Sequence, residues 1–270
     1  MRIKLYLLLS FVFFNVIVYA QNVSVCSWNL KDFGQSKSDA TLGFIVKTVK
    51  SFDVIALQEI VAGPGGSQAV AKLVAQLNKT GNLWHAEISN VTSGVNTNER
   101  YAFIWKANKI TKVATSWLDL NYNVLIDREP YFSRFKINTK TFTLVNFHAI
   151  PKAKHPETEI KYFQFFPGLY PKDNLIFCGD FNLPQSHSVF TPLKSMGYVS
   201  ALVKQKTSLR QKCINDDCLA SEYDNFYFAA AKINMTESGI IHFYRLFNNL
   251  KLARKISDHV PIYMKFSLKS

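Results

Sequence analysis

The chain alternates short apolar segments, of the length of buried strands, with amphipathic segments of helical periodicity. Strands are predicted at residues 23–28, 53–58, 84–89, 101–106, 111–118, 130–137, 141–148, 174–180, 225–230 and 260–268. Helices are predicted at 38–51, 67–78, after Pro156, at 187–196 and at 242–252. Because strands dominate and helices separate them, we expect an α+β fold. Its architecture would be a four-layer sandwich, in which two packed, mixed β-sheets are flanked by α-helices.

The N-terminal residues have the composition of an export signal. Arg2 and Lys4 precede an apolar stretch from Leu5 to Tyr19, and Ala20 closes it. This order predicts a secretory signal peptide at residues 1–20, and hence a secreted protein, extracellular or periplasmic. An uncleaved membrane anchor is the alternative, but the stretch is short for the roughly 20 residues that span a bilayer. Residues 21–270 are expected to form one domain.

Basic residues outnumber acidic ones by 32 to 19, which gives a formal net charge of +13. Such a charge suits a polyanion such as nucleic acid, or an anionic membrane surface. A solvated basic surface is the alternative for any one cluster, and no obligate protein partner is evident, so a monomer is expected. The basic clusters are Lys152, Lys154 and His155; Lys204, Lys206, Arg210 and Lys212; and Arg245, Lys251, Arg254 and Lys255.

The four cysteines fall into two groups with different expected roles. Cys213 and Cys218 enclose a short polar loop, which predicts a local disulfide in an exported chain. Cys26 and Cys178 lie in apolar strand-like segments and are expected to be buried, with pairing open if their strands are neighbours. The chain has no Cys-x-x-Cys or paired Cys/His spacing, which argues against a zinc site.

Polar side chains stand at the ends of the buried strand-like segments. Each alone has an ordinary explanation, such as a capping asparagine, a core histidine or a turn aspartate. If the strand ends converge, the side chains form a site of hard oxygen ligands and two imidazoles. Such oxygens suit Mg²⁺, with Mn²⁺ or Ca²⁺ also possible. The residues are Asn29, Glu59, Asn146, His148, Asp180, Asn182, Asp258 and His259.

Four short motifs occur in an order that resembles the endonuclease/exonuclease/phosphatase superfamily. They are Ser27-Trp28-Asn29, Leu57-Gln58-Glu59, Gly179-Asp180-Phe181-Asn182 and Ser257-Asp258-His259. Further segments resemble the deoxyribonuclease I branch of that superfamily: Asn98-Glu99-Arg100-Tyr101, Arg128-Glu129-Pro130, residues 146–151 and residues 222–225. The resemblance covers essentially the whole chain after the signal peptide. It implies a metal-dependent endonuclease that hydrolyses DNA with little sequence preference.

The resemblance also implies a role for each matching residue. Glu59 would hold the metal, with Asn29 and Asp258 close by. His148 and His259 would flank the scissile phosphate as general base and general acid, because an imidazole can do either near neutral pH. The remaining roles follow the same pattern: Glu99 orients His148, Asp224 orients His259, Asp180 and Asn182 position water and phosphate oxygens, and Arg100 and Arg128 bind substrate phosphate.

The chain departs from the deoxyribonuclease I pattern at positions that grip duplex DNA. Val61 stands where that family has an arginine for the minor groove, and Thr97 stands where it has a stacking tyrosine. Gln185 replaces the first cysteine of a long disulfide, and the small disulfide loop before Arg128 is missing. The structural calcium site of the family and the preference for duplex are therefore left open.

Two other functions fit parts of the sequence. A phospholipase C-like phosphodiesterase of the sphingomyelinase type would present apolar side chains to a membrane, for which Phe163, Phe165, Phe166, Leu169 and Tyr170 are candidates. A core helix and turn is the ordinary explanation of that segment. The other function is that of a non-enzymatic toxin or adhesion subunit on a decayed nuclease scaffold. The site residues argue against such decay, because the chain retains all four of Glu59, His148, Asp180 and His259.

Overall fold

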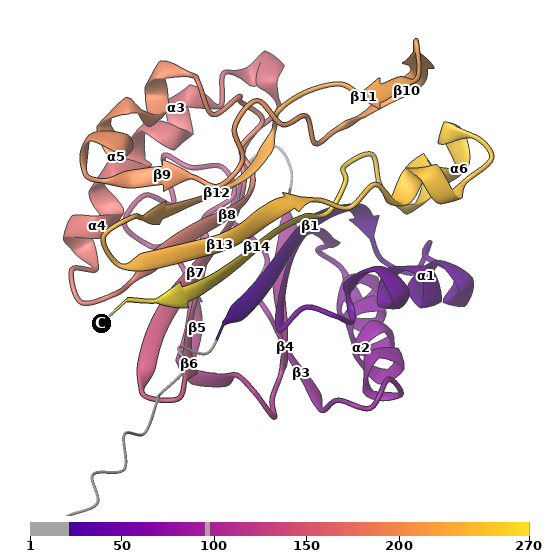
Figure 1. Ribbon diagram of the computed structural model, residues 1–270, viewed down its shortest axis with the longest axis horizontal. Helices are drawn as coiled ribbons and strands as arrows, with labels where there is room; N and C mark the ends of the chain where they lie inside the picture. Colours follow the sequence, from indigo (N-terminus) through magenta and orange to yellow (C-terminus); the bar gives the residue numbers. More distant parts are fainter. Residues whose placement is uncertain (1–21, 95–97, 270) are drawn as a thin grey trace, which may run out of the picture.

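The computed structural model describes residues 22–94 and 98–269, which form two six-stranded β-sheets (Figure 1). The first sheet has the order β13 (Ile233–Ile240), β14 (Ile262–Leu268), β1 (Val23–Phe33), β2 (Val54–Val61), β4 (Glu99–Lys106) and β3 (Trp84–Ile88). The second has the order β5 (Thr111–Leu118), β6 (Tyr131–Ile137), β7 (Lys140–His148), β8 (Leu175–Asp180), β12 (Asp224–Ala229) and β9 (Tyr198–Ser200). The β1–β2 and β7–β8 pairs are parallel and their neighbours are antiparallel, so both sheets are mixed.

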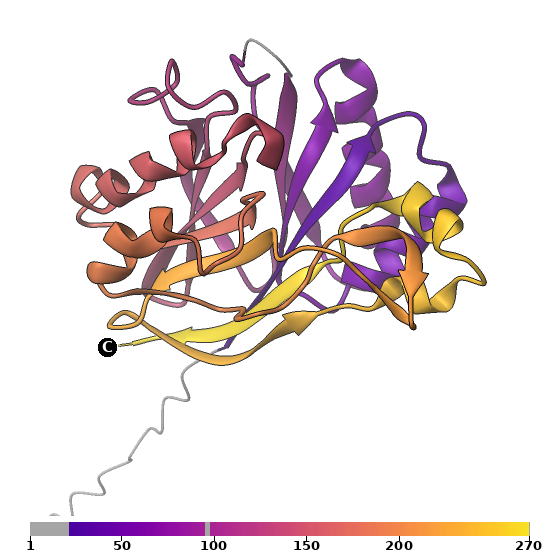
Figure 2. The same cartoon turned by 90° about the horizontal axis from the view of Figure 1, so that it is seen from above.

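The backbone forms four layers (Figure 2), and three clusters of apolar side chains lie between them. One apolar cluster lies between the sheets and includes Phe103, Phe142 and Phe266. A second lies between the first sheet and α1 (Asp39–Val49), α2 (Pro64–Asn78) and α6 (Leu250–Ile256). A third lies under α3 (Glu157–Ile160), η2 (Lys161–Phe165), α4 (Phe166–Leu169), η3 (Ser188–Phe190) and α5 (Thr191–Ser195). The expected α+β sandwich is therefore confirmed.

Strand β8 shows how the sheet delivers a polar end to the site. Every residue of the strand from Leu175 to Asp180 is buried, as its apolar sequence predicts. Gly179 has φ +133°, and a Cβ atom there would lie 1.9 Å from the carbonyl oxygen of Phe147 on β7. Only glycine permits this close approach of the two strands. Asp180 is consequently held directly beside His148, its partner in the β7–β8 register.

Two of the predicted helices form as continuous helices, and two others are split into shorter elements. Helix α1 agrees with the prediction, and the Ser38 side chain caps it by accepting from the amide of Thr41. Helix α2 begins at Pro64, three residues before the predicted start, and proline is favoured in the first turn of a helix. The expected helix at 187–196 is split between η3 and α5, and the one after Pro156 between α3, η2 and α4.

The predicted continuous helix at 242–252 is wrong. The chain forms η4 (Phe243–Leu246), leaves helical geometry, and restarts as α6 after Asn249. The Asn249 side chain accepts from the amide of Leu252, which is a helix N-cap. Phe243 and Phe247 both pack against Phe44 of α1, and this packing directs the break.

Sequence patterns missed four strands because those strands are short, exposed or polar. They are β9, β10 (Leu209–Ile214), β11 (Asp217–Leu219) and β13. Strand β13 lies at a sheet edge and carries exposed polar residues, so it lacks an apolar period. Strands β10 and β11 form a hairpin closed by the predicted Cys213–Cys218 disulfide, which is confirmed. Cys26 and Cys178 are buried free thiols.

Two expectations concern membranes or residues 1–20. The predicted signal peptide lies outside the described residues. Within residues 22–94 and 98–269, no helix has the length and apolar character needed to cross a membrane. In the aromatic segment at 163–170, Phe163 and Phe166 are buried in the core and only Phe165 and Leu169 are exposed apolar side chains. The ordinary explanation of that segment, a core helix and turn, is the better one.

Candidate active site

A polar pocket opens where several strands of the two sheets end. His148 and Asp180 come from the ends of the neighbouring parallel strands β7 and β8, and Glu59 comes from the end of β2. Glu99 begins β4, and Asp258 and His259 precede β14. The strand ends therefore converge, and they bring together side chains from distant parts of the chain.

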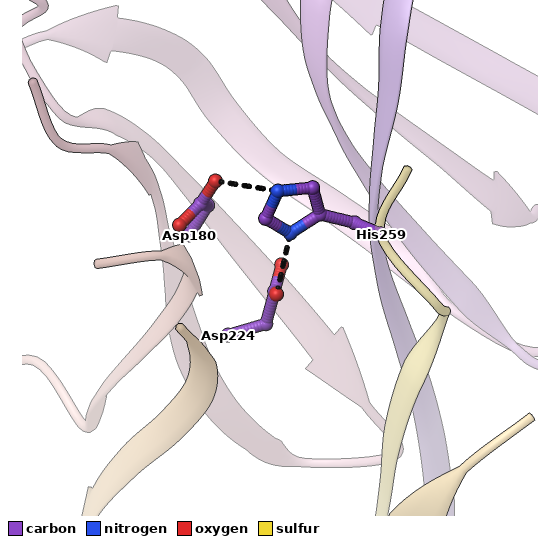
Figure 3. Close-up of side chains that lie close together, drawn as sticks. All are labelled: Asp180, Asp224 and His259. Atoms are coloured by element: carbon purple, nitrogen blue, oxygen red, sulfur yellow. Dashed lines mark hydrogen bonds and ion pairs between the residues drawn. The ribbon is translucent and has the colours of Figure 1, made fainter. Parts of the chain in front are cut away.

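His259 lies between two buried carboxylates (Figure 3). Its Nδ1 atom is 2.7 Å from Oδ2 of Asp224, and its Nε2 atom is 3.5 Å from Oδ2 of Asp180. The hydrogen bond to Asp224 fixes the tautomer and orientation of the ring, so that Nε2 faces the pocket. Asp224 in turn accepts from the hydroxyl of Thr207 at 2.6 Å.

His148 repeats this arrangement from the opposite side. Its Nδ1 atom is 2.9 Å from Oε2 of Glu99, and its Nε2 atom is 3.6 Å from Oδ2 of Asp180. The backbone amide of His148 donates to the hydroxyl oxygen of Tyr101, and the same hydroxyl donates to the carbonyl of Arg128. Two oriented imidazoles thus present Nε2 to the same oxygen of Asp180.

Asp180 is held by its neighbours in that central position. Its Oδ1 atom accepts from the backbone amide of Asn182, and its Oδ2 atom accepts from the side-chain amide of Asn29 at 3.2 Å. Asn182 has φ +52° and donates from its side chain to the carbonyl of Ala149. Asparagine tolerates this left-handed backbone better than most residues. The Asp180-Phe181-Asn182 turn therefore needs its particular residue types.

The buried carboxylates raise the pKa values of the two histidines. Burial lowers the pKa of His259, but Asp224 and Asp180 outweigh burial and raise that pKa to about 10. Burial also lowers the pKa of His148, yet the overall direction is upward because of the Glu99 carboxylate. The pKa of Glu99 is lowered although burial alone would raise it, because His148 and Arg128 favour its charged form. Each histidine thus contacts a buried carboxylate in the pocket wall, and that carboxylate raises the pKa of its imidazole.

Glu59 faces the pocket from a distorted part of the sheet. Its φ of +59° coincides with a register shift between β2 and β4, and Lys31 and Asp32 on β1 also have positive φ. The Glu59 carboxylate accepts from the side chain of Asn29 at 2.8 Å and from the amide of Asp32 at 3.1 Å. Its backbone amide donates to Glu99. Strained backbone of this kind is typical of functional sites.

Comparisons with known proteins agree with this geometry. The model of the Endonuclease/Exonuclease/phosphatase family matches residues 26–249. The chain belongs to this family. It is 26% identical to bovine (Bos taurus) Deoxyribonuclease-1 over 263 residues, covering 89% of this chain and 91% of the relative. It is 25% identical to rat (Rattus norvegicus) Deoxyribonuclease gamma over 276 residues, covering 91% and 85%.

A solved structure supports the same fold assignment. An endonuclease/exonuclease/phosphatase family protein from Bacteroides thetaiotaomicron superposes with a TM-score of 0.68 at 14% identity, covering 93% of this chain and 99% of the other. At that identity the likeness concerns the fold alone. The resemblance to deoxyribonuclease I-like members of the endonuclease/exonuclease/phosphatase family extends over most of the chain.

The two arginines expected to bind phosphate are engaged with the protein. Arg128 lines the pocket, but its guanidinium donates to the carbonyls of His148 and Ala149 and lies 3.3 Å from Glu99. Arg128 therefore braces the His148–Glu99 pair. Arg100 donates to the carbonyls of Ala62 and Ser89 and is not among the described residues that line the pocket. This placement suits a residue that holds the pocket rim rather than a direct phosphate ligand.

Asp258, which was expected to lie close to the metal, contacts two cationic side chains. Its Oδ2 atom lies 3.2 Å from Nζ of Lys31 and 3.1 Å from the guanidinium of Arg254. Burial raises the pKa of Asp258, but His259 and Lys31 outweigh burial and lower that pKa overall. Asp258 is thus an anion at neutral pH, and any metal at this carboxylate would share it with Lys31.

The donor set of the pocket fits a hard divalent cation. Glu59 presents a carboxylate with 26% of its side chain exposed, and Asp258 contributes a second one. Asn29 points its amide nitrogen at Glu59, and its oxygen accepts from the amide of Lys31. Among the described residues, a further group that could hold an ion is Asp180, Asp224 and His259. The short Asp224–His259 hydrogen bond accounts for that group without a metal.

Several residues of the site had no signal in the sequence. Thr207 lies far from Asp224 along the chain and in an irregular segment, so no pattern pointed to it. No sequence motif marks Lys31 as a site residue. The bulge in β1 directs its side chain toward Asp258. Tyr101 belongs to the segment 98–101 that resembles the deoxyribonuclease I branch, but its role was not predicted. Its hydroxyl forms hydrogen bonds with the backbone of His148 and Arg128. Val61 lies on the pocket rim, and Thr97 lies outside the described residues.

Proposed function

We propose that the chain is a metal-dependent phosphodiesterase that hydrolyses the backbone of DNA with little sequence preference. The observation that carries this proposal is the convergence of His148 Nε2 and His259 Nε2 on one oxygen of Asp180. Each imidazole has its own buried carboxylate, Glu99 or Asp224. Two proton carriers on either side of one anion suit a reaction that takes a proton from water and gives one to a leaving oxygen.

The proposed reaction is an in-line displacement at phosphorus. One imidazole accepts a proton from water at Nε2 while a water oxygen bonds to phosphorus. The other donates a proton from Nε2 to the sugar oxygen as the bond between that oxygen and phosphorus breaks. Asp180 and Asn182 orient the water and the phosphate oxygens. Glu59, with Asp258 and Asn29 beside it, would hold Mg²⁺, which offsets negative charge on the phosphoryl oxygens when bound.

We further propose that residues 1–20 direct export and are removed, which places the enzyme outside the cytoplasm. The similarity to Deoxyribonuclease-1 and Deoxyribonuclease gamma supports DNA as the substrate. N-terminal sequencing of protein recovered from the culture medium or periplasm would test cleavage after Ala20.

The function is tested on supercoiled plasmid, linear duplex, single-stranded DNA and RNA, with Mg²⁺ and with a chelator. We expect His148→Ala and His259→Ala each to lower plasmid cleavage by about 10² to 10⁴-fold, with the fold preserved. The matched control is His85→Ala, an exposed histidine on β3. Near-normal cleavage by both site variants, or full activity in the chelator, would contradict the proposal.

A further inference from the structure

The segment that precedes Asp258 and His259 is acid-free and strongly basic. Residues 238–257 contain no aspartate or glutamate, and they carry Arg245, Lys251, Arg254 and Lys255. The segment contains the end of β13, η4 and α6, and we call the exposed face of η4 and α6 the basic wall. Arg245, Lys251 and Lys255 are exposed on it.

The apolar side chains of this segment hold the basic wall in place. Phe243 packs against Trp28 and Phe44, and Ala253 and Ile256 are buried against the first sheet. Other apolar side chains of the segment, Leu246 and Leu252, are exposed together with Arg245, Lys251 and Lys255. The wall is thus a fixed feature of the surface rather than a mobile tail.

The basic wall is continuous with the pocket. Lys37 donates to the carbonyls of Lys255 and Ile256 at the end of α6, and the Ser257 hydroxyl donates to the carbonyl of Asn29. Arg254 joins the wall to Asp258 and also donates to the carbonyl of Leu209 at the start of the β10–β11 hairpin. The hairpin and α6 lie on the same side of the molecule in both ribbon views (Figures 1 and 2).

One part of the pocket rim has no charged side chain. It is formed by Val61, Ala62 and Gly63, and Arg100 beneath it is occupied with backbone carbonyls. Inside the pocket, Arg128 is likewise occupied by His148, Ala149 and Glu99. The exposed lysines of the basic wall are therefore better placed to meet further phosphates of a bound strand.

We infer that the basic wall is a docking surface for the phosphate backbone of the nucleic-acid substrate, on the His259 side of the scissile phosphate. This inference rests on the proposed function and adds the direction in which the strand leaves the pocket. Contacts to phosphates of this kind give affinity and register without reading sequence. The positive charge of the basic wall would provide a contact with the nucleic acid that Val61 does not provide.

The test compares Lys251→Gln/Lys255→Gln with Lys72→Gln/Lys79→Gln, which removes two exposed lysines on or next to α2. Binding of a fluorescent duplex is measured by anisotropy at several NaCl concentrations in a His148→Ala background, which limits cleavage. We expect the slope of log affinity against log salt to fall by about 1 to 2 for the wall variant only. Hydrolysis of bis(p-nitrophenyl) phosphate by the otherwise wild-type wall variant should be unchanged.

An unchanged slope in the wall variant would overturn the inference, as would an equal change in the α2 control. A third variant, Lys152→Gln/Lys154→Gln, removes the exposed lysines of η1 (Lys152–Lys154). If only that variant altered the slope, the strand would lie on the other side and the inference would be wrong. Binding to anionic vesicles but not to duplex would also overturn it. Failure of the unmodified chain to hydrolyse DNA and the small diester would instead reject the proposed function.

Discussion

The hydroxyl of Thr207 donates to Oδ2 of Asp224 at 2.6 Å, and both side chains are buried. The same Asp224 oxygen lies 2.7 Å from Nδ1 of His259. Thr207 Oγ1 also accepts from the amides of Tyr223 and Asp224, so its own proton is directed at the carboxylate. Thr207 is therefore a positioning residue, which acts on the reaction only through the Asp224–His259 pair.

Thr207→Val is expected to lower kcat for DNA cleavage about tenfold, and Thr207→Ser is expected to restore most of it. A hydrogen bond to a charged group contributes about 1.5 kcal/mol or more, which corresponds to roughly a tenfold rate. In a His259→Ala background the valine variant should have no additional effect, because its partner is gone. Additive losses in the double variant would show that Thr207 acts by another route.

Glu59→Gln is expected to raise the Mg²⁺ concentration needed for half-maximal activity by at least about tenfold. The substitution keeps the size and one oxygen of the side chain but removes the charge that attracts a hard cation. Isothermal titration of Mg²⁺ into the protein without substrate measures the same change directly. Glu237→Gln, at an exposed carboxylate paired with Lys265, is the matched control. Identical Mg²⁺ curves for both variants would remove Glu59 from the metal site.

Asn146→Ala is expected to lower the free energy of unfolding by about 2 to 3 kcal/mol, measured by urea denaturation. The Asn146 side chain joins the two sheets: it accepts from Gln58 on β2 at 2.5 Å and donates to the carbonyl of Leu57 at 3.0 Å. Removing it leaves buried polar groups without their partner. Asn108→Ala, at an exposed asparagine, should change stability by no more than about 0.5 kcal/mol. Equal effects of the two substitutions would contradict a structural role for the link.

Asp173→Asn should lower the melting temperature at pH 7, and its effect should shrink as the pH falls below about 4. Burial raises the pKa of Asp173, but the bidentate Arg134 and the Thr143 hydroxyl outweigh burial and lower that pKa overall. Because the folded-state pKa lies below the unfolded one, the stabilisation is complete above the unfolded pKa and is lost as pH falls through the folded pKa. The contribution is about 1 kcal/mol, since Arg134 is partly exposed. A pH-independent difference between wild type and variant would count against the ion pair.

Local sequence patterns predicted the architecture because each buried strand carries its own signal. The run before Asp180 is apolar throughout and is buried throughout, and α1 buries the face that its Leu42, Ile45, Val46 and Val49 periodicity marks. The break between η4 and α6 had no such signal, since the apolar residues on either side keep a helical spacing. It arises from the packing of Phe243 and Phe247 against Phe44, which is a long-range contact.

The residue types of the site could be named from the sequence, since motifs and resemblance pointed to Glu99, His148, Asp180, Asp224 and His259. Their relative positions could not. The β7–β8 register and the close approach at Gly179 place Asp180 beside His148, and the loop before β14 brings His259 to the other side.

The sequence by itself determined which strands are buried and which polar residue stands at each strand end, because burial and periodicity are local properties of the chain. Only the tertiary structure decided that one oxygen of Asp180 serves both imidazoles, that Thr207 supports Asp224, and that Arg128 and Arg100 are held by backbone carbonyls. Those relationships depend on strand register and on distances between residues far apart in the chain. No local pattern encodes such distances, since many different long-range pairings are compatible with the same succession of strands.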